Sequence, residues 1–202
     1  MFPLPDITLF PHTFLPLHIF EARYRCLVAD ILARDRRLCI AQLEPGYEAT
    51  YAGKPAVRGV AGAGEIVKWE RLPSGRYNIL VKGEMRVRIE SEHPSDTLYR
   101  IAIGRRLEEL EPRDDVSAAR ARVGAGCRRL LALLKRPPDL LDATLADDQP
   151  PGAVADRVAA AVIPEPSTRQ RLLETLDVGA RLGLLADALD ALVNELQRRG
   201  GG

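Results

Sequence analysis

The sequence changes character near residue 112, and this change constrains the fold more than any other feature. Before it, short runs of Val, Ile, Tyr and Thr alternate with Gly and Pro, whereas after it Ala, Leu, Arg and Asp recur at helical spacing. Strands followed by helices are typical of an α+β protein or of two domains. We therefore predict an α+β fold with a β-rich unit over residues 1–111, a helical bundle over 112–199 and a disordered tail over 200–202.

The first unit predicts six or seven short strands and one early helix. The helix is expected over residues 21–34, where Tyr24, Leu27, Val28, Ile31 and Leu32 share one face. Strands are expected at 7–11, 16–20, 37–43, 64–70, 76–82, 85–90 and 97–107. Short strands with glycine corners favour a small closed or pseudo-closed barrel over a doubly wound sheet.

Three glycine or alternation patterns refine this picture. Gly83 is predicted to separate the strand at 76–82 from the strand at 85–90. Within 85–90, Met85, Val87 and Ile89 alternate with Arg86, Arg88 and Glu90, which predicts a half-buried strand with the charged side chains outward. Gly59, Gly62 and Gly64 do not fit a dinucleotide-binding GxGxxG motif and are expected to serve a bulge or a tight corner.

Four helices are expected in the second unit. The first is capped by Asp114 or Asp115 and runs to about Lys135, and the second covers about 152–162. A capping box over 167–170 predicts a third, short helix, and Asp177 is expected to cap the last. That last helix carries a leucine-rich seam, which packs either within the bundle or against another molecule; its members are Val178, Leu182, Leu185, Leu189, Leu192 and Leu196.

Charge argues against several functional classes. Residues 1–111 carry 16 basic and 15 acidic side chains, and residues 112–202 carry 13 of each. Proteins that depend on phosphate contacts show a basic excess, so the balance argues against nucleic-acid binding. The one Gly-Lys pair, Gly53-Lys54, is followed by Pro55 and fits no P-loop, so no nucleotide cofactor is expected.

Candidate catalytic and metal sites are weak. His12, His18 and Glu21 offer a two-histidine, one-carboxylate set, but the histidines are six residues apart across Pro16, so we expect no metal. A Ser–His pair around His93 and a thiol at Cys127 activated by its arginine neighbours are the alternatives for a small hydrolase. We expect no catalytic residue.

The three cysteines form no metal-ligand pair and suggest reduced thiols in the cytoplasm, with Cys26 and Cys39 as small buried hydrophobes. The N-terminus shows no basic region followed by an apolar run, and no stretch is long enough to cross a membrane. The sequence therefore predicts a cytoplasmic chain without a signal peptide and without membrane contact.

All four phenylalanines lie in the first 20 residues, together with Pro3, Pro5, Pro11 and Pro16. Apolar alternation assigns Phe10 and Phe20 to the core. Phe14 and His12 lie in the connection between Pro11 and Pro16, and apolar groups in a connection are better candidates for an interaction surface.

The same residues carry a family resemblance. Residues 2–11 (FPLPDITLFP) and 15–24 (LPLHIFEARY) are similar to the opening signature of the Lon protease N-terminal, substrate-binding domain. The segments 64–67, 72–79 and 82–89 resemble a second block of that family, and residues 171–182 resemble its closing block. The resemblance covers about residues 2–196 and implies a PUA-like pseudo-barrel followed by a helical bundle.

The resemblance also implies a function. In Lon proteases this domain precedes an ATPase module and a Ser–Lys protease module, and this chain is expected to be a free-standing relative of the domain without either. We expect a non-catalytic module that binds unfolded or degron-bearing polypeptide, with a separate protease or chaperone as a further partner. The candidate peptide-binding residues are His12, Phe14, His18, Glu21, Tyr24 and Arg88.

Each candidate has a structural alternative, and other functions stay open. Glu21 and Arg23 are explained equally by a pairing at the helix start, and Tyr24 by the core. RNA binding by analogy with other PUA-like folds would need an arginine surface from Arg86, Arg88, Arg105 and Arg106. An adaptor or oligomerisation role would use the seam of the last helix, and the oligomeric state is left open.

Overall fold

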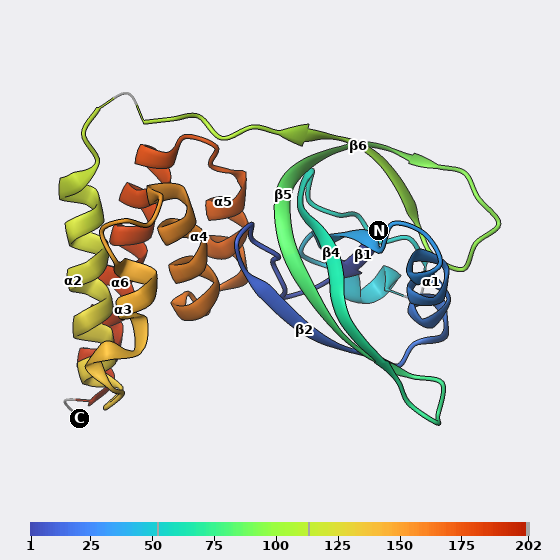
Figure 1. Ribbon diagram of the computed structural model, residues 1–202, viewed down its shortest axis with the longest axis horizontal. Helices are drawn as coiled ribbons and strands as arrows, with labels where there is room; N and C mark the ends of the chain where they lie inside the picture. The colour runs from blue at the N-terminus through green and yellow to red at the C-terminus, as the bar shows by residue number, and fades with distance from the viewer. Residues whose placement is uncertain (52, 113, 201–202) are drawn as a thin grey trace. The chain divides into compact units, whose positions relative to one another are not determined.

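The computed structural model describes residues 1–51, 53–112 and 114–200. The chain divides into two compact units, residues 1–107 and 108–202. The first unit is a curled β-sheet with one helix and the second is helical, so the predicted α+β class is confirmed (Figure 1). Gly200 is the last residue of a helix, and residues 201–202 of the predicted tail lie outside the described part of the chain.

Six strands form one mixed sheet in the first unit. The elements are, in chain order, β1 (Phe2–Leu4), β2 (Phe14–Ile19), α1 (Ala22–Leu32), β3 (Arg37–Gln42), the 3-10 turn η1 (Tyr47–Thr50), β4 (Val60–Arg71), β5 (Tyr77–His93) and β6 (Ile101–Leu107). The strand order is β1-β3-β4-β5-β2, with β6 also paired to β5. The first half of β5 pairs with β2 and its second half with β6, so this long strand curls the sheet into a pseudo-barrel (Figure 1).

Strand β5 is continuous through Gly83, so the predicted break between 76–82 and 85–90 is wrong. The register of β4 and β5 shifts between Ala63 and Gly64, which confirms an irregularity at the glycines of β4. Glycine is needed here for space. A Cβ at Gly83 would lie 1.9 Å from the Phe10 carbonyl oxygen, and one at Gly62 would lie 1.7 Å from that of Leu9.

The segment that crosses these glycines explains a second error. A strand was predicted at 7–11, but residues 7–10 form none, and the first strand is β1. The backbone of Leu9 and Phe10 lies directly over β4 and β5, where it cannot join their hydrogen-bonded ladder. Both side chains are buried, which confirms Phe10 as a core residue.

The same crossing buries an arginine. Arg86 was predicted to face solvent on β5, yet it is 1% exposed. Arg86 pairs in register with Gly62 of β4, and directly paired residues project on the same face of an antiparallel sheet. Leu9 passes over Gly62 on that face, so Arg86 lies beneath covered rather than open sheet.

The main core of the first unit lies between α1 and the inner face of the sheet. Tyr24, Leu27 and Val28 of α1 are buried, as the helical spacing predicts, and pack in one cluster with β-strand residues. The strand members of this cluster are Phe2, Ile19, Leu38, Ile40, Ile66, Tyr77, Ile79 and Val81. The helix therefore closes one side of the pseudo-barrel.

Among its described residues, the second unit contains five helices and one 3-10 turn: α2 (Ser117–Leu133), η2 (Pro138–Leu141), α3 (Asp142–Leu145), α4 (Pro151–Val162), α5 (Pro166–Glu174) and α6 (Val178–Gly200). Asp177 caps α6 through its carboxylate and the Ala180 N–H, at 2.8 Å, as predicted. The capping box predicted for α5 is wrong, because the helix begins at Pro166 and the Ser167 hydroxyl bonds to the Glu165 carboxylate instead.

Most of the leucine-rich seam of α6 packs inside the bundle. Leu182, Leu185 and Leu189 are fully buried, and Leu189 lies against Gly126 of α2. Beside the seam, fully buried Arg181 forms ion pairs with Asp156 of α4 (2.8 Å) and with Glu109 (2.6 Å). Burial acts to lower the pKa of Arg181, but these two carboxylates raise it above its ordinary value, so the guanidinium stays charged.

Candidate functional site

Strand β2 presents a row of side chains to solvent. Exposure alternates along it, with Leu15, Leu17 and Ile19 turned toward the core. The outward side chains are His12, Phe14, Pro16, His18 and Phe20, which we call the β2 row. Phe14 and Phe20 are each 60% exposed. Exposed apolar side chains that gather on one surface, rather than lying singly, mark candidate interaction sites.

The start of the row is fixed by the glycine crossing. His12 adopts a left-handed backbone conformation, with φ 62°. Its N–H donates to the Gly83 carbonyl at 3.0 Å, and the Gly83 N–H donates to the Thr13 carbonyl at 2.9 Å. The Thr13 hydroxyl in turn donates to the Phe10 carbonyl. This turn joins the buried segment before it to a strand whose alternate residues face outward.

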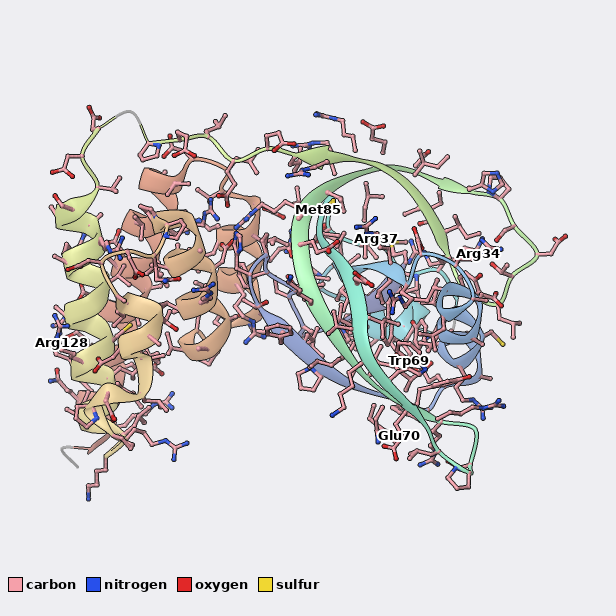
Figure 2. The ribbon with its side chains drawn as sticks, viewed as in Figure 1. Arg34, Arg37, Trp69, Glu70, Met85 and Arg128 are labelled. Atoms are coloured by element: carbon pink, nitrogen blue, oxygen red, sulfur yellow. The ribbon has the colours of Figure 1, made fainter. Side chains whose placement is uncertain are left out.

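Polar side chains flank the row on the neighbouring strands. His18 pairs in register with Asn78 of β5, which pairs with Glu70 of β4. The Asn78 amide donates to a Glu70 oxygen at 3.2 Å, and its Oδ1 lies 2.7 Å from His18 Nδ1. Because Asn78 Oδ1 is an acceptor, His18 Nδ1 carries the proton in this arrangement. Figure 2 labels Glu70 on β4.

The structure brings together three of the six candidate residues. His12, Phe14 and His18 share the β2 row, whereas Tyr24 is buried with its hydroxyl 3.4 Å from the Pro3 carbonyl. Burial raises the pKa of Tyr24 to about 12. Tyr24 is therefore a core residue, which agrees with the alternative interpretation of this position rather than with peptide binding.

Glu21 and Arg88 do not belong to the β2 row. The Glu21 carboxylate pairs with Arg23 at 3.0 Å and accepts a hydrogen bond from the Tyr51 hydroxyl, so it braces the start of α1. Arg88 is exposed on β5, six residues beyond Lys82, where the pairing with β2 ends. At about 3.3 Å per residue this is roughly 20 Å along the strand.

Sequence reasoning missed Phe20 and Pro16. Phe20 was assigned to the core, but it is exposed and its ring stacks with His18 at a centroid distance of 6.4 Å. The signal was present in the sequence, because His12 to Phe20 alternate with period two. The alternation alone did not tell which of the two faces would be covered.

One cysteine differs from expectation, and another rules out an alternative nucleophile. Cys26 is exposed on α1 rather than buried. Cys127 is buried, and burial raises the pKa of its thiol to about 11, which outweighs the lowering by Arg128. Cys127 is thus not an activated nucleophile.

In residues 1–51, 53–112 and 114–200, no three His, Cys, Asp or Glu side chains gather in a way that could hold a metal ion. Within the same ranges, no helix combines the length and hydropathy needed to cross a membrane.

Solved structures share this architecture. The N-terminal domain of the Mycobacterium avium complex Lon protease superposes with a TM-score of 0.74 at 20% identity, over 93% of this chain and 95% of that one. A Lon N-terminal domain protein from Xanthomonas campestris gives a TM-score of 0.64 at 22% identity, over 91% and 94% of the two chains. These similarities confirm the fold predicted from the resemblance.

Sequence comparison points the same way. A Lon protease of Xanthomonas oryzae pv. oryzae is 27% identical over 98% of this chain, and Lon protease 2 of Sorangium cellulosum is 30% identical over 91%. The chain spans about a quarter of the length of these relatives, 23% in both cases. The model of the ATP-dependent protease La (LON) substrate-binding domain matches residues 1–191. On this match, which covers nearly the whole chain, the protein belongs to the Lon substrate-binding domain family.

Proposed function

We propose that the chain recognises polypeptide segments through the β2 row and does not itself catalyse a reaction. The observation that carries the proposal is the exposure of Phe14 and Phe20, 60% each, at two positions of one outward row. The family is described as a substrate-binding domain, and its relatives are named as proteases, which supports a polypeptide as the ligand.

The spacing of the row suits an extended chain. Alternate residues of a strand are about 6.6 Å apart, and the eight steps from His12 to Phe20 span about 26 Å. Side chains of an extended peptide on one face repeat at the same distance. An unfolded segment with apolar residues at alternate positions can therefore place them against Phe14, Pro16 and Phe20.

The row favours recognition by side chains over addition of a peptide strand. Strand β2 pairs with β5 on one side, and Pro16 in its middle has no N–H to donate. A peptide that paired with the outer edge of β2 would lose a ladder hydrogen bond there, because proline protects such edges. Contacts across the outward face need no backbone donor from Pro16.

The expected affinity is low, on the order of micromolar to millimolar, because the row is a shallow surface and an unfolded ligand loses entropy on binding. A cytoplasmic location and hand-over of the bound polypeptide to a separate protease or chaperone belong to the same proposal. The relatives' names support the protease.

The decisive experiment is binding of the purified chain to an array of unfolded peptides, with an RNA pool as the control. Phe14→Ala and Phe20→Ala should each weaken binding about tenfold at an unchanged melting temperature. The matched control is Leu98→Ala, because Leu98 is also apolar and highly exposed (65%) but does not belong to the β2 row. Equal loss of binding in all three variants would contradict the proposed surface.

A second arm tests the mode of contact. Peptides with N-methylated backbone amides should bind as well as the unmodified ones, because the row contacts side chains. Strand addition would instead be abolished by the methyl groups.

The alternatives have less support from the structure. Of the four arginines proposed for RNA, Arg86 is buried, whereas Arg88, Arg105 and Arg106 are exposed, and Arg105 is paired with Glu90 at 3.1 Å. Most of the seam proposed for oligomerisation lies inside the bundle. Salt-sensitive capture of the RNA pool without peptide binding would restore the first alternative.

A further inference from the structure

A cavity of about 570 Å³ lies in the first unit and shares no residue with the β2 row. Its walls come from α1, from the turn after α1 and from strands β3, β4, β5 and β6. Figure 2 labels three side chains that line it, Arg34, Arg37 and Met85. The volume falls in the range of small-molecule sites, which runs from about 300 to 1,000 Å³.

The interior of the cavity is apolar. Leu27, Ile31 and Leu38 form one wall, and Met85 and Ile101 contribute from the sheet. Cys39 also lines it, and burial raises the pKa of its thiol, so this side chain is neutral. The hydroxyl of Tyr99, another lining residue, is already donated to Asp30 at 2.7 Å. These surfaces suit a hydrocarbon chain or ring.

Charge is concentrated in the turn that joins α1 to β3. Arg36 adopts a left-handed conformation, with φ 59°. The N–H groups of Arg34 and Arg36 both donate to the Ile31 carbonyl at 3.0 Å. This tight turn brings Arg34, Asp35 and Arg37 to the cavity as lining residues.

The charges in this turn are unequally satisfied. Asp35 Oδ1 accepts the Arg37 backbone N–H at 3.2 Å, and the Arg37 side chain pairs with Glu84 at 3.3 Å. Across the described ranges 1–51, 53–112 and 114–200, no carboxylate lies within ion-pair distance of the Arg34 guanidinium. Among the side chains that line the cavity, Arg34 is therefore the cation that is available to a ligand.

We propose that this cavity binds a ligand with an apolar body and a terminal carboxylate. The apolar body packs against Leu27, Leu38 and Met85, and the carboxylate pairs with Arg34. A guanidinium offers parallel N–H donors that match the two oxygens of a carboxylate. Two sources share this chemistry, a free organic acid and the C-terminal residue of a polypeptide.

The sequence supplies a direct reporter. The chain has two methionines, Met1 and Met85, and both line the cavity. Methyl-¹³C-methionine labelling therefore places both NMR signals of the label in the proposed site. Titration of the full chain with decanoate should shift the Met85 signal saturably. Decanol, which has the same length without the charge, should bind about tenfold more weakly, because a hydrogen bond to a charged group is lost.

Variants separate the carboxylate contact from the apolar one. Arg34→Gln should weaken decanoate about tenfold and leave decanol unchanged, whereas Arg76→Gln, at an exposed arginine of the β4–β5 turn, should change neither. Ala63→Leu should fill part of the cavity and weaken both ligands. Retained near-ultraviolet circular dichroism shows that each variant is folded, and the Arg34 result stands if Ala63→Leu does not fold.

Two peptides then distinguish the sources. A tetrapeptide that ends in leucine with a free carboxylate is compared with its C-terminal amide. A shift of Met85 by the free acid but not by the amide identifies a polypeptide C-terminus, and a shift by decanoate alone identifies an organic acid; either supports the proposal. Equal binding of decanoate and decanol, or an unmoved Met85 signal with every ligand, overturns it. Phe14→Ala should leave these titrations unchanged, so this test is independent of the β2 row.

Discussion

Two neighbouring stretches near the N-terminus, residues 7–10 and strand β2, are both mostly apolar, yet their phenylalanines differ in exposure. Phe10 is fully buried, whereas Phe14, four residues later, is 60% exposed. The first stretch crosses the sheet over two glycines, and the second pairs along its edge. The difference shows that the path of the backbone, and not the hydrophobicity of the side chains, separates buried from exposed residues in this part of the chain.

The largest expected effect on stability comes from a substitution where residues 9–10 cross the sheet. Gly83→Ala should cost about 3 kcal/mol or more of the free energy of unfolding, because the new Cβ would lie 1.9 Å from the Phe10 carbonyl oxygen and backbone cannot move aside easily. Chemical denaturation measures the loss. Gly59→Ala is the control, because no atom lies within 4 Å of its Cβ position. Equal stabilities of the two variants would show that the crossing does not depend on the absence of a side chain at Gly83.

The two phenylalanines test the contrast directly. Phe10→Ala should destabilise the chain by about 3–5 kcal/mol, since it empties a buried site. Phe14→Ala should change the stability by less than about 0.5 kcal/mol, as exposed substitutions usually do. Urea unfolding of both variants decides the matter, and a large loss for Phe14→Ala would mean that it supports the fold.

The burial of Tyr24 predicts a dependence of the free energy of unfolding on pH. Burial raises its pKa to about 12 from an ordinary value of 10, so the folded chain holds the hydroxyl proton more tightly than the unfolded chain. Stability should therefore be unaffected by this group below pH 10 and fall between pH 10 and 12, by roughly 1–3 kcal/mol.

The measurement is the free energy of unfolding across this pH range. Tyr24→Phe removes the ionisable group and should flatten the alkaline fall, at a small cost at neutral pH for the weak bond to the Pro3 carbonyl. A fall of the same size in Tyr24→Phe would assign the alkaline sensitivity to other groups.

The cysteines extend the contrast with the smallest effect on stability. A thiol reagent at pH 8 should modify Cys26, which is exposed, and leave Cys127, whose burial raises its thiol pKa to about 11, unmodified in the folded chain. Mass spectrometry of the labelled peptides gives the result. Cys26→Ser should abolish the rapid reaction and leave the stability within about 0.5 kcal/mol, and labelling of Cys127 at the same rate would show that the helical unit opens readily.

Helices and regular strands were predictable from periodicity, because each needs only its own neighbours in the sequence. The spacing of Tyr24, Leu27 and Val28 predicted the buried face of α1, and the hairpin of β4 and β5 followed from its turn residues. The predicted break at Gly83 and the predicted strand at 7–11 failed for one shared reason. Gly83 leaves space for the backbone of Phe10, which crosses the sheet at this position. That contact involves both stretches, so it cannot be inferred from the sequence of either one alone.

The candidate site was predictable in part. His12, Phe14 and His18 were placed together by their nearness in sequence, and the structure places them on one row. Phe20 and Tyr24 were harder, because apolar aromatics satisfy both a core and a surface interpretation. Only the side of the sheet that α1 covers decides between them.

The sequence by itself determined the α+β class, the family, the amphipathic helix and the cap of α6 at Asp177, since these depend on local periodicity, capping and motif. The tertiary structure alone decided which face of β2 meets water, why Arg86 is buried and where Arg34 stands at the cavity. The physical reason is that burial is a property of pairs of surfaces. The residues of a strand determine which side chains share each of its two faces. The segment that covers one of those faces comes from elsewhere in the chain.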